Sequence, residues 1–130
     1  MTHSLPIRVY YEDTDLAGIV YYANYLKFIE RGRSEWVRGL GIDQIALRQT
    51  HGLVFAVRRI EADYLRPAHF DDMLDITTTL IALTAARITL DQQVLRGAEV
   101  LFSARVVLVC LGPQGRPTRL PGDLRRLLAT

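Results

Sequence analysis

This 130-residue chain has few cysteine, histidine and serine residues, which serve in many catalytic and metal sites. It has one cysteine, Cys110, which lies in an apolar run, so no disulfide can form within the chain and the thiol is predicted to be buried and inert. The three histidines are scattered and show no spacing typical of a metal site. None of the serines lies in a Gly-x-Ser-x-Gly elbow, which argues against a serine triad.

The chain also lacks the features of nucleic-acid-binding, secreted or membrane-spanning proteins. Its formal net charge of +2 is small and Lys27 is its only lysine, so charge gives no support for binding to nucleic acid. No apolar run approaches the ~20 residues of a membrane span. The first residues do not combine a basic segment with an apolar stretch, as a signal peptide would. We therefore expect a cytoplasmic protein with no membrane span.

What the chain has in quantity is apolar residues arranged in short periodic segments. Its hydrophobic content of 49% is enough for the core of one domain, predicted over residues 1–130. Residues 7–11 predict a first strand, and over 22–40 the apolar residues recur at the spacing of one buried helix face. Gly32 lies inside this helix, where a close approach of the helix to a sheet would explain it.

The rest of the chain predicts strands joined by short turns. Residues 42–52 suit a short helix and a turn, and a terminal helix is expected from Pro121 to residue 128. Four segments rich in β-branched or apolar residues predict strands: 53–65, 73–83, 87–95 and 99–111. The continuous apolar run in the last segment suggests a strand covered on both faces. The predicted fold is α+β, with one long helix packed on a five-stranded antiparallel sheet.

Asp15 is the first candidate for chemistry, because it lies in the acidic loop at residues 12–18, just before the long helix. The first N–H groups of a helix have no intrahelical partner and can donate to a developing oxyanion. A carboxylate that faces them across a bound carbonyl can attack that carbonyl or take a proton from an attacking water. From position alone, however, a helix cap or a turn is the commoner role of such an aspartate.

The segment around Asp15, residues 10–26 (YYEDTDLAGIVYYANYL), closely resembles the signature of hotdog-fold thioesterases of the 4-hydroxybenzoyl-CoA thioesterase type. The branch that it resembles most is the YbgC subfamily, which is associated with the Tol-Pal cell-envelope system. The resemblance continues through residues 28–33 and 64–72 and ends in the strand at 106–110. It implies the hotdog fold, in which an antiparallel sheet wraps around a long central helix.

The resemblance implies an acyl-CoA thioesterase that releases a free acid and coenzyme A. Asp15 would be the catalytic carboxylate, as nucleophile or general base, and the backbone N–H of Tyr22 would polarise the thioester carbonyl. Many YbgC-like members have a histidine where this chain has Tyr22, so no imidazole is expected to assist here. Tyr11, Gly18 and Val20 are expected to contact substrate, although strand packing is an equal alternative for Tyr11. Gly18 would let the substrate approach because it has no side chain.

The resemblance also implies the partners of the chain. Coenzyme A carries phosphates, and Arg58, Arg59 and Arg87 are the arginines predicted to bind them, with a solvated surface charge as the alternative for each. No metal or organic cofactor is implied. Family members are dimers or tetramers with active sites at subunit interfaces, so a homo-oligomer, dimeric or homotetrameric, is expected.

Two other functions stay open at this point. A hotdog dehydratase or hydratase usually relies on a catalytic histidine with a carboxylate, and no histidine lies near the Asp15 loop. A non-catalytic module that binds acyl thioesters or an envelope complex is the second alternative, and the intact loop argues against it. Thioesters of acyl carrier protein are a further candidate substrate class, and no motif indicates the length or aromatic character of the acyl group.

Overall fold

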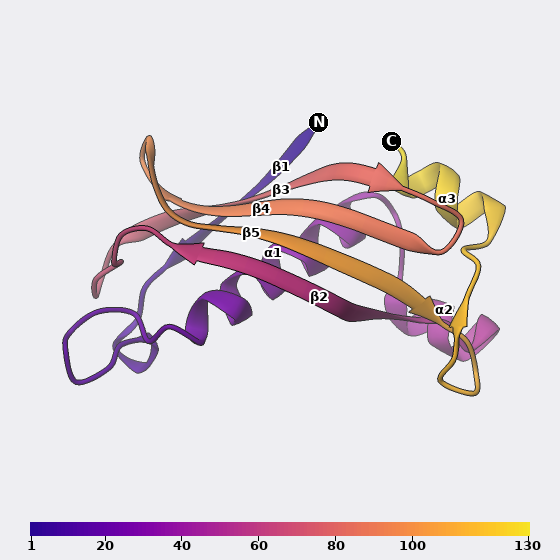
Figure 1. Cartoon of the computed structure of the whole chain (residues 1–130), viewed down its shortest axis with the longest axis horizontal. Coiled ribbons are helices and arrows are strands. Elements are labelled where there is room, and N and C mark those ends of the chain that lie inside the picture. The colour runs from indigo at the N-terminus through magenta and orange to yellow at the C-terminus, as the bar shows by residue number, and fades with distance from the viewer.

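A computed structural model describes all 130 residues, which form an antiparallel sheet curved around one long helix (Figure 1). The elements are β1 (Thr2–Arg8), the 3₁₀-helix η1 (Tyr11–Asp13), α1 (Asn24–Gly39), α2 (Gln44–His51), β2 (Val54–Tyr64), β3 (Met73–Leu83), β4 (Arg87–Arg96), β5 (Glu99–Leu111), β6 (Pro117–Thr118) and α3 (Gly122–Leu128). The strand order is β1-β3-β4-β5-β2, with β6 beside β5. No helix is long and apolar enough to cross a membrane.

The predicted α+β class and its five strands are confirmed, and the short β6 is added to them. The first strand was misplaced, because β1 covers Thr2–Arg8 and not residues 7–11. Pro6 is tolerated because β1 is an edge strand, paired only with β3. Beyond β1 the chain leaves the sheet, since the Tyr10 N–H donates to Asp13 Oδ2 and the next residues coil into η1.

α1 lies on one face of the sheet, mainly over β1, β3 and β4, and comes closest to it at Gly32. A Cβ atom built on Gly32 would lie 2.7 Å from Cγ2 of Ile76 in β3. Beneath the same turn, the buried amide of Gln92 donates through Nε2 to the Ile29 carbonyl oxygen at 2.9 Å. The predicted close approach of helix to sheet at Gly32 is therefore confirmed.

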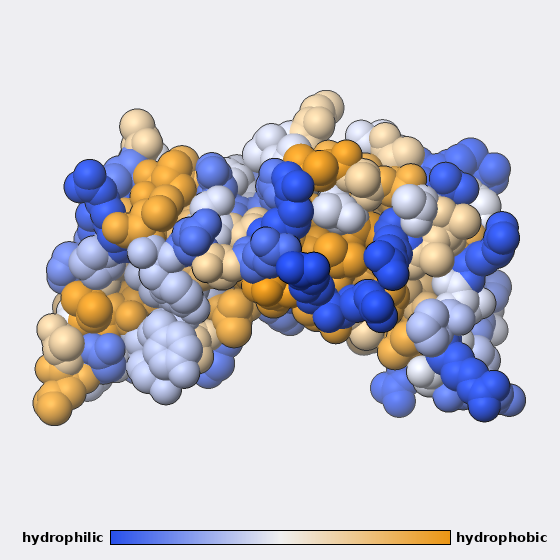
Figure 2. Space-filling view, in the orientation of Figure 1, coloured by the Kyte–Doolittle hydropathy of each residue, from blue (hydrophilic) through white to orange (hydrophobic).

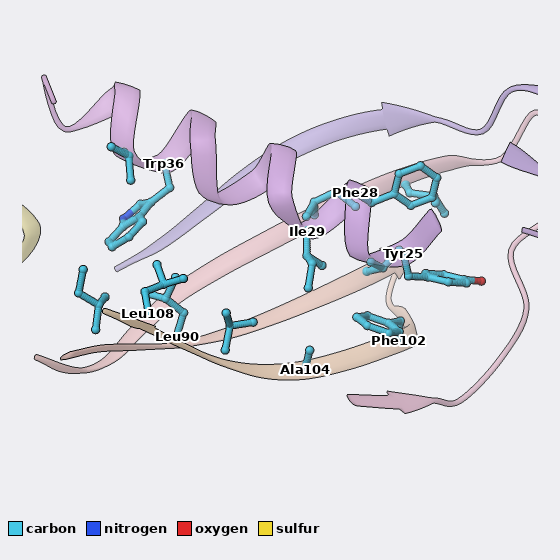
Figure 3. Packing of buried hydrophobic residues seen from close by; sticks show 14 of the residues in the cluster. Tyr25, Phe28, Ile29, Trp36, Leu90, Phe102, Ala104 and Leu108 are labelled. Atoms are coloured by element: carbon cyan, nitrogen blue, oxygen red, sulfur yellow. The ribbon is translucent and has the colours of Figure 1, made fainter. Parts of the chain in front are cut away.

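Apolar side chains fill the space between α1 and the sheet. Figure 3 shows the helix residues pointing at strand residues across this layer: Tyr25, Phe28, Ile29 and Trp36 from α1, and Leu90, Phe102, Ala104 and Leu108 from β4 and β5. The prediction that β5 is covered on both faces is wrong for the single chain. Val106 and Leu108 are buried under α1, whereas Val107 and Val109 on the opposite face are only half-buried.

Cys110 is 1% exposed at the end of β5. Desolvation in this apolar setting raises the pKa of its thiol. The predicted burial of the thiol is therefore confirmed, and the raised pKa agrees with the expected low reactivity.

Candidate active site

The acidic loop is a closed turn with Asp15 at its base. The Asp15 N–H donates to the Ile19 carbonyl oxygen at 2.9 Å, and the Gly18 N–H donates back to the Asp15 carbonyl oxygen at 3.0 Å. Gly18 has φ +80°, a conformation that glycine adopts without strain. Asp15 Oδ1 accepts the Ala17 N–H at 2.9 Å, so one carboxylate oxygen is used within the loop and Oδ2 has no partner in the chain.

The loop docks on the segment that follows β2. The Val20 N–H donates to the Ala68 carbonyl oxygen at 2.9 Å, and Ile19 pairs with His69 in an isolated bridge. From the helix side, the buried hydroxyl of Tyr25 accepts the Ala68 N–H at 3.0 Å. Three segments far apart in the sequence thus meet at one end of α1, opposite α2 and α3 (Figure 1).

The turn that enters α1 has free N–H groups. The Asn24 N–H donates to the Tyr21 carbonyl oxygen at 2.8 Å, whereas the N–H groups of Tyr22 and Ala23 have no acceptor in the chain. No side chain caps the helix, so the alternative of Asp15 as the cap of α1 is wrong. The hydrogen bond that Asp15 Oδ1 accepts from the Ala17 N–H agrees instead with the alternative role in a turn. The positive end of the helix dipole therefore meets unpaired donors.

A cavity of about 380 Å³ opens where these elements meet. Its lining comes from Asp15, from residues 19–22 at the entry to α1, from Tyr25 and from residues 64–67 after β2. Most of this lining is apolar or aromatic, with the Asp15 carboxylate and the Arg66 guanidinium as its charged groups. The cavity therefore combines a carboxylate, unpaired helix amides and an apolar wall.

Tyr64 ties the cavity wall to the donor turn. Its hydroxyl donates to the Tyr22 carbonyl oxygen at 3.0 Å, and its ring lies edge-on to the rings of Tyr22 and Phe102. Burial raises the pKa of the Tyr64 phenol, and it raises that of Tyr25 as well. Both phenols are therefore neutral around pH 7 and keep their protons.

A third phenol, Tyr21, shares this wall. Its pKa is raised above the ordinary value first by the Tyr22 phenol and in smaller part by the negative charge of Asp15. The charge of Asp15 therefore acts on the Tyr21 phenol, just before the helix start.

Of the residues predicted for the site, Asp15, Val20 and Tyr22 line the same cavity. Tyr11 does not line it, because it belongs to η1, is 82% exposed and packs edge-on against Phe70. Neither strand packing nor contact with this cavity describes Tyr11. Gly18 lies at the exposed tip of the acidic loop, outside the cavity lining.

The predicted arginines lie away from the cavity in the single chain. Arg58 and Arg59 are exposed on β2, and Arg59 pairs with Glu61 at 2.7 Å. The expectation that Arg87 lies near the site is wrong for this chain. Arg87 begins β4 opposite Val109, at the end of the sheet near α3, because the β3–β4 turn is at the far end from the acidic loop (Figure 1).

Sequence reasoning missed seven of the ten residues that line the cavity, Tyr64 and Arg66 among them. Both lie in segment 64–72, which carries part of the family resemblance, so the sequence marked this segment but indicated no role for either residue. Tyr64 is 42 residues from its partner Tyr22, and neither periodicity nor local spacing indicates such a contact.

An antiparallel sheet around a long helix, with a carboxylate beside free amides at the helix start, defines the class of hotdog-fold thioesterases. Residues 9–128 match the model of the Thioesterase-like superfamily. The chain is 38% identical over 124 residues to the acyl-CoA thioesterase YbgC of Haemophilus influenzae, covering 94% of this chain and 90% of that protein. It is 38% identical over 121 residues to the acyl-CoA thioester hydrolase YbgC of Escherichia coli, covering 92% and 90%.

The fold comparison agrees. The crystal structure of a probable thioesterase from Bartonella henselae matches this chain with a TM-score of 0.89 and 40% sequence identity. The match covers 93% of this chain and 100% of that one. The chain therefore belongs to the Thioesterase-like superfamily, and it is an enzyme that hydrolyses thioesters.

Proposed function

We propose that the chain hydrolyses acyl-CoA thioesters to a free acid and coenzyme A, with Asp15 as the catalytic carboxylate. The observation that carries the proposal is that Asp15 and the unpaired N–H of Tyr22 border one cavity. The names of the YbgC relatives, acyl-CoA thioesterase and acyl-CoA thioester hydrolase, support the substrate class.

The free amides at the helix start suit the carbonyl oxygen of the thioester. In the proposed complex this oxygen accepts the Tyr22 N–H, with Ala23 as a neighbouring donor, and gains negative charge as the carbonyl carbon is attacked. Loss of one such donor typically costs ~3–4 kcal/mol of transition-state stabilisation. Because the donors are backbone groups, the tyrosine at position 22 supplies them as well as a histidine would.

Asp15 has two routes to the same products. As a general base it takes a proton from water, the water oxygen bonds to the carbonyl carbon, and the C–S bond breaks as the thiolate of coenzyme A leaves. As a nucleophile it bonds to the carbonyl carbon itself, expels the thiolate, and leaves a mixed anhydride that water then hydrolyses. Single turnover in ¹⁸O-labelled water can separate the two, since label in the Asp15 side chain requires the covalent route.

Arg66 is the cation best placed for the phosphates of coenzyme A, because it lines the cavity and its side chain is 66% exposed. Its Nη1 lies 3.2 Å from Glu99 Oε2, an exposed pair that a phosphate can compete with. Arg58 and Arg59 could reach a substrate only at the open edge of β2. Arg87 stays a prediction for an assembled enzyme.

A homo-oligomer is part of the proposal. β2 is an edge strand whose outer backbone groups have no partner strand, and its first half exposes Val54 and Val57, so pairing with a strand of a second copy is favourable there. The sheet face turned away from α1 also carries hydrophobic patches among its hydrophilic side chains (Figure 2). A second copy on β2 would lie beside Tyr64 and the cavity. Analytical ultracentrifugation tests this, and a concentration-independent monomer contradicts it.

The catalytic role of Asp15 is tested by Asp15→Asn. The amide keeps an oxygen for the Ala17 N–H, so the fold and ligand binding should be retained. Loss of the carboxylate should lower kcat by roughly 10²–10⁴-fold, the usual weight of a general base. Steady-state kinetics by thiol release measures kcat, and the melting temperature is the control for folding. An Asp15→Asn variant that keeps most of the original kcat would contradict the proposal.

One substrate panel determines both which acyl group is preferred and which carrier, coenzyme A or acyl carrier protein, holds it. Short, long and aromatic acyl-CoAs are compared with the same acyl groups on acyl carrier protein, by thiol release under identical conditions. Hydrolysis of the CoA thioesters supports the proposal, and preference for the carrier protein shifts it to that substrate. No release from any member favours a binding module, and formation or loss of a double bond in the acyl chain favours a dehydratase or hydratase.

The cytoplasmic location stays a prediction, to be checked by cell fractionation.

A further inference from the structure

Asp13 is a buried carboxylate that neither the motif analysis nor the proposed chemistry uses. Its exposed fraction is 6%, lower than that of any other acidic residue in the chain. A buried carboxylate usually pairs with a cation, but none of the ion pairs of the chain includes Asp13. Hydrogen bonds satisfy it instead, so their arrangement indicates what the residue is for.

Both carboxylate oxygens of Asp13 are used, and they bind two different elements. Oδ2 accepts the Tyr10 N–H at 2.8 Å, which closes η1. Oδ1 accepts Nδ2 of Asn24 at 2.9 Å, and Asn24 is the first residue of α1 with an exposed fraction of 9%. A cap for η1 needs only the first bond. The second bond fastens the acidic loop to the helix start.

The backbone of Asp13 repeats the same connection. Its carbonyl oxygen accepts the Tyr21 N–H at 2.9 Å, and the Tyr21 carbonyl oxygen accepts the Asn24 N–H at 2.8 Å. Asp13 therefore holds the residue before Tyr22 and the second residue after it. Along the loop, Asp13 is two residues from Asp15, which is itself fixed by its bond to Ile19.

We infer that Asp13 and Asn24 form a strut that sets the distance between the Asp15 carboxylate and the free Tyr22 N–H, and that both act as positioning residues for thioester hydrolysis. The inference rests on the proposed function of Asp15 and Tyr22. Neither strut residue lines the cavity, so they act through the loop and the helix start and do not touch substrate. A displacement of about 1 Å between reacting groups can cost roughly 10²-fold in rate.

The test exchanges the two side chains. Asn24→Asp sets two carboxylates against each other, and the Oδ1 bond is lost. We expect kcat to fall at least tenfold with KM within about twofold, because the cavity lining is untouched. In the double variant Asp13→Asn/Asn24→Asp, the new amide accepts the Tyr10 N–H and donates to the new carboxylate. The strut is rebuilt, and kcat should return to within about threefold of the original.

Asp13→Asn alone is the second variant, since it should fold even where Asn24→Asp does not. The Asn24 amide can turn its oxygen toward the new donor, so kcat should fall less than about threefold. Asp43→Ala is the matched control, because Asp43 caps α2 through the N–H groups of Ile45 and Ala46, away from the cavity. It should lower the melting temperature and leave kcat unchanged.

The outcomes separate the strut from the proposed chemistry. If Asp15→Asn is inactive and Asn24→Asp keeps the original kcat, the strut is overturned and the chemistry stands. A folded double variant that stays as slow as Asn24→Asp overturns the strut as well. If Asp15→Asn stays active while Asn24→Asp is slow and the exchange restores kcat, the role of Asp15 fails, and the strut is overturned as stated because it then orients the Tyr22 N–H without a catalytic carboxylate. Where Asn24→Asp is unfolded, the double variant decides: a folded Asp13→Asn/Asn24→Asp with kcat within about threefold of the original supports the strut, and a folded double variant at least tenfold slower overturns it.

Discussion

The start and the middle of α1 are held to the rest of the molecule in different ways. At the middle, Gly32 lies against β3 because it has no side chain. The atoms that a Cβ there would meet belong to Ile76, Thr78 and Gln92, all of them buried. At the start, hydrogen bonds hold an irregular turn in place: the Asp13 carboxylate accepts one, and the Tyr64 hydroxyl and the Ala68 N–H each donate one. The middle is fixed by shape, and the start is fixed by polar partners.

The two arrangements leave different groups free. At the helix middle the buried Gln92 amide is fully paired: Nε2 donates to Thr78 and Ile29, and Oε1 accepts from Arg33. At the helix start, the polar partners surround the Tyr22 N–H without using it. A substitution at the middle should therefore change stability, and one at the start should change activity more than stability.

Gly32→Ala should have the largest effect on stability. The new Cβ would lie 2.7 Å from Ile76 Cγ2, on a branched side chain that cannot swing away. Overpacking costs ~1–3 kcal/mol and better helix propensity offsets ~1 kcal/mol, so the free energy of unfolding should fall by up to about 2 kcal/mol. Urea denaturation measures it. Gly39→Ala, where a Cβ meets nothing within 4 Å, is the control and should gain ~0.5–1 kcal/mol. Equal effects at both positions would contradict the shape argument.

Tyr64→Phe should act mainly on kcat. The substitution keeps the ring in the cavity wall and removes the hydroxyl that donates to the Tyr22 carbonyl oxygen at 3.0 Å. A bond of this kind contributes ~0.5–1.5 kcal/mol, which corresponds to roughly a twofold to tenfold fall in kcat if it orients the donor turn. Steady-state kinetics shows it. The exposed Tyr10 is the control, and Tyr10→Phe should leave kcat unchanged. A rise in KM alone would mean that the Tyr64 hydroxyl binds substrate instead.

The same division explains how much could be predicted from the sequence. Strands β3 and β5 have the predicted bounds, because their patterns are local, and Gly32 marked the close approach of helix to sheet. β1 was misplaced because the residues after Arg8 have strand-like composition, while the Val9 N–H donates to the Asp72 carbonyl oxygen and the Tyr10 N–H to the Asp13 side chain. Local composition does not contain that competition between a sheet ladder and a side chain.

For the candidate site, the motif named Asp15 and Tyr22, and both residues line the cavity. The supports of that site were not visible in the same way. Tyr64 contacts Tyr22 from 42 residues away, and nothing in the composition of the acidic loop predicts that Asp13 is buried. Chemistry-bearing residues cluster in a motif, but the residues that orient them depend on how distant segments pack.

Asp72→Asn should have the smallest effect, and it tests the turn that braces the helix start from outside. Partial burial alone raises the pKa of Asp72, but the His69 N–H and the Arg96 guanidinium, both 2.8 Å from Oδ2, outweigh it and hold this pKa below its ordinary value. A lowered folded-state pKa stabilises the fold above the unfolded value of ~3.9, and this stability is lost as pH falls through the folded value.

The asparagine can still accept the His69 N–H, so the substitution removes only the charge that pairs with Arg96. The variant should therefore be less stable than the original chain at pH 7, and the difference should shrink toward zero below about pH 4. Urea denaturation at several pH values measures it, with Asp75→Asn, an exposed aspartate without an ion pair, as the control. A difference that does not depend on pH would mean that shape, and not charge, braces this end of α1 as it does the middle.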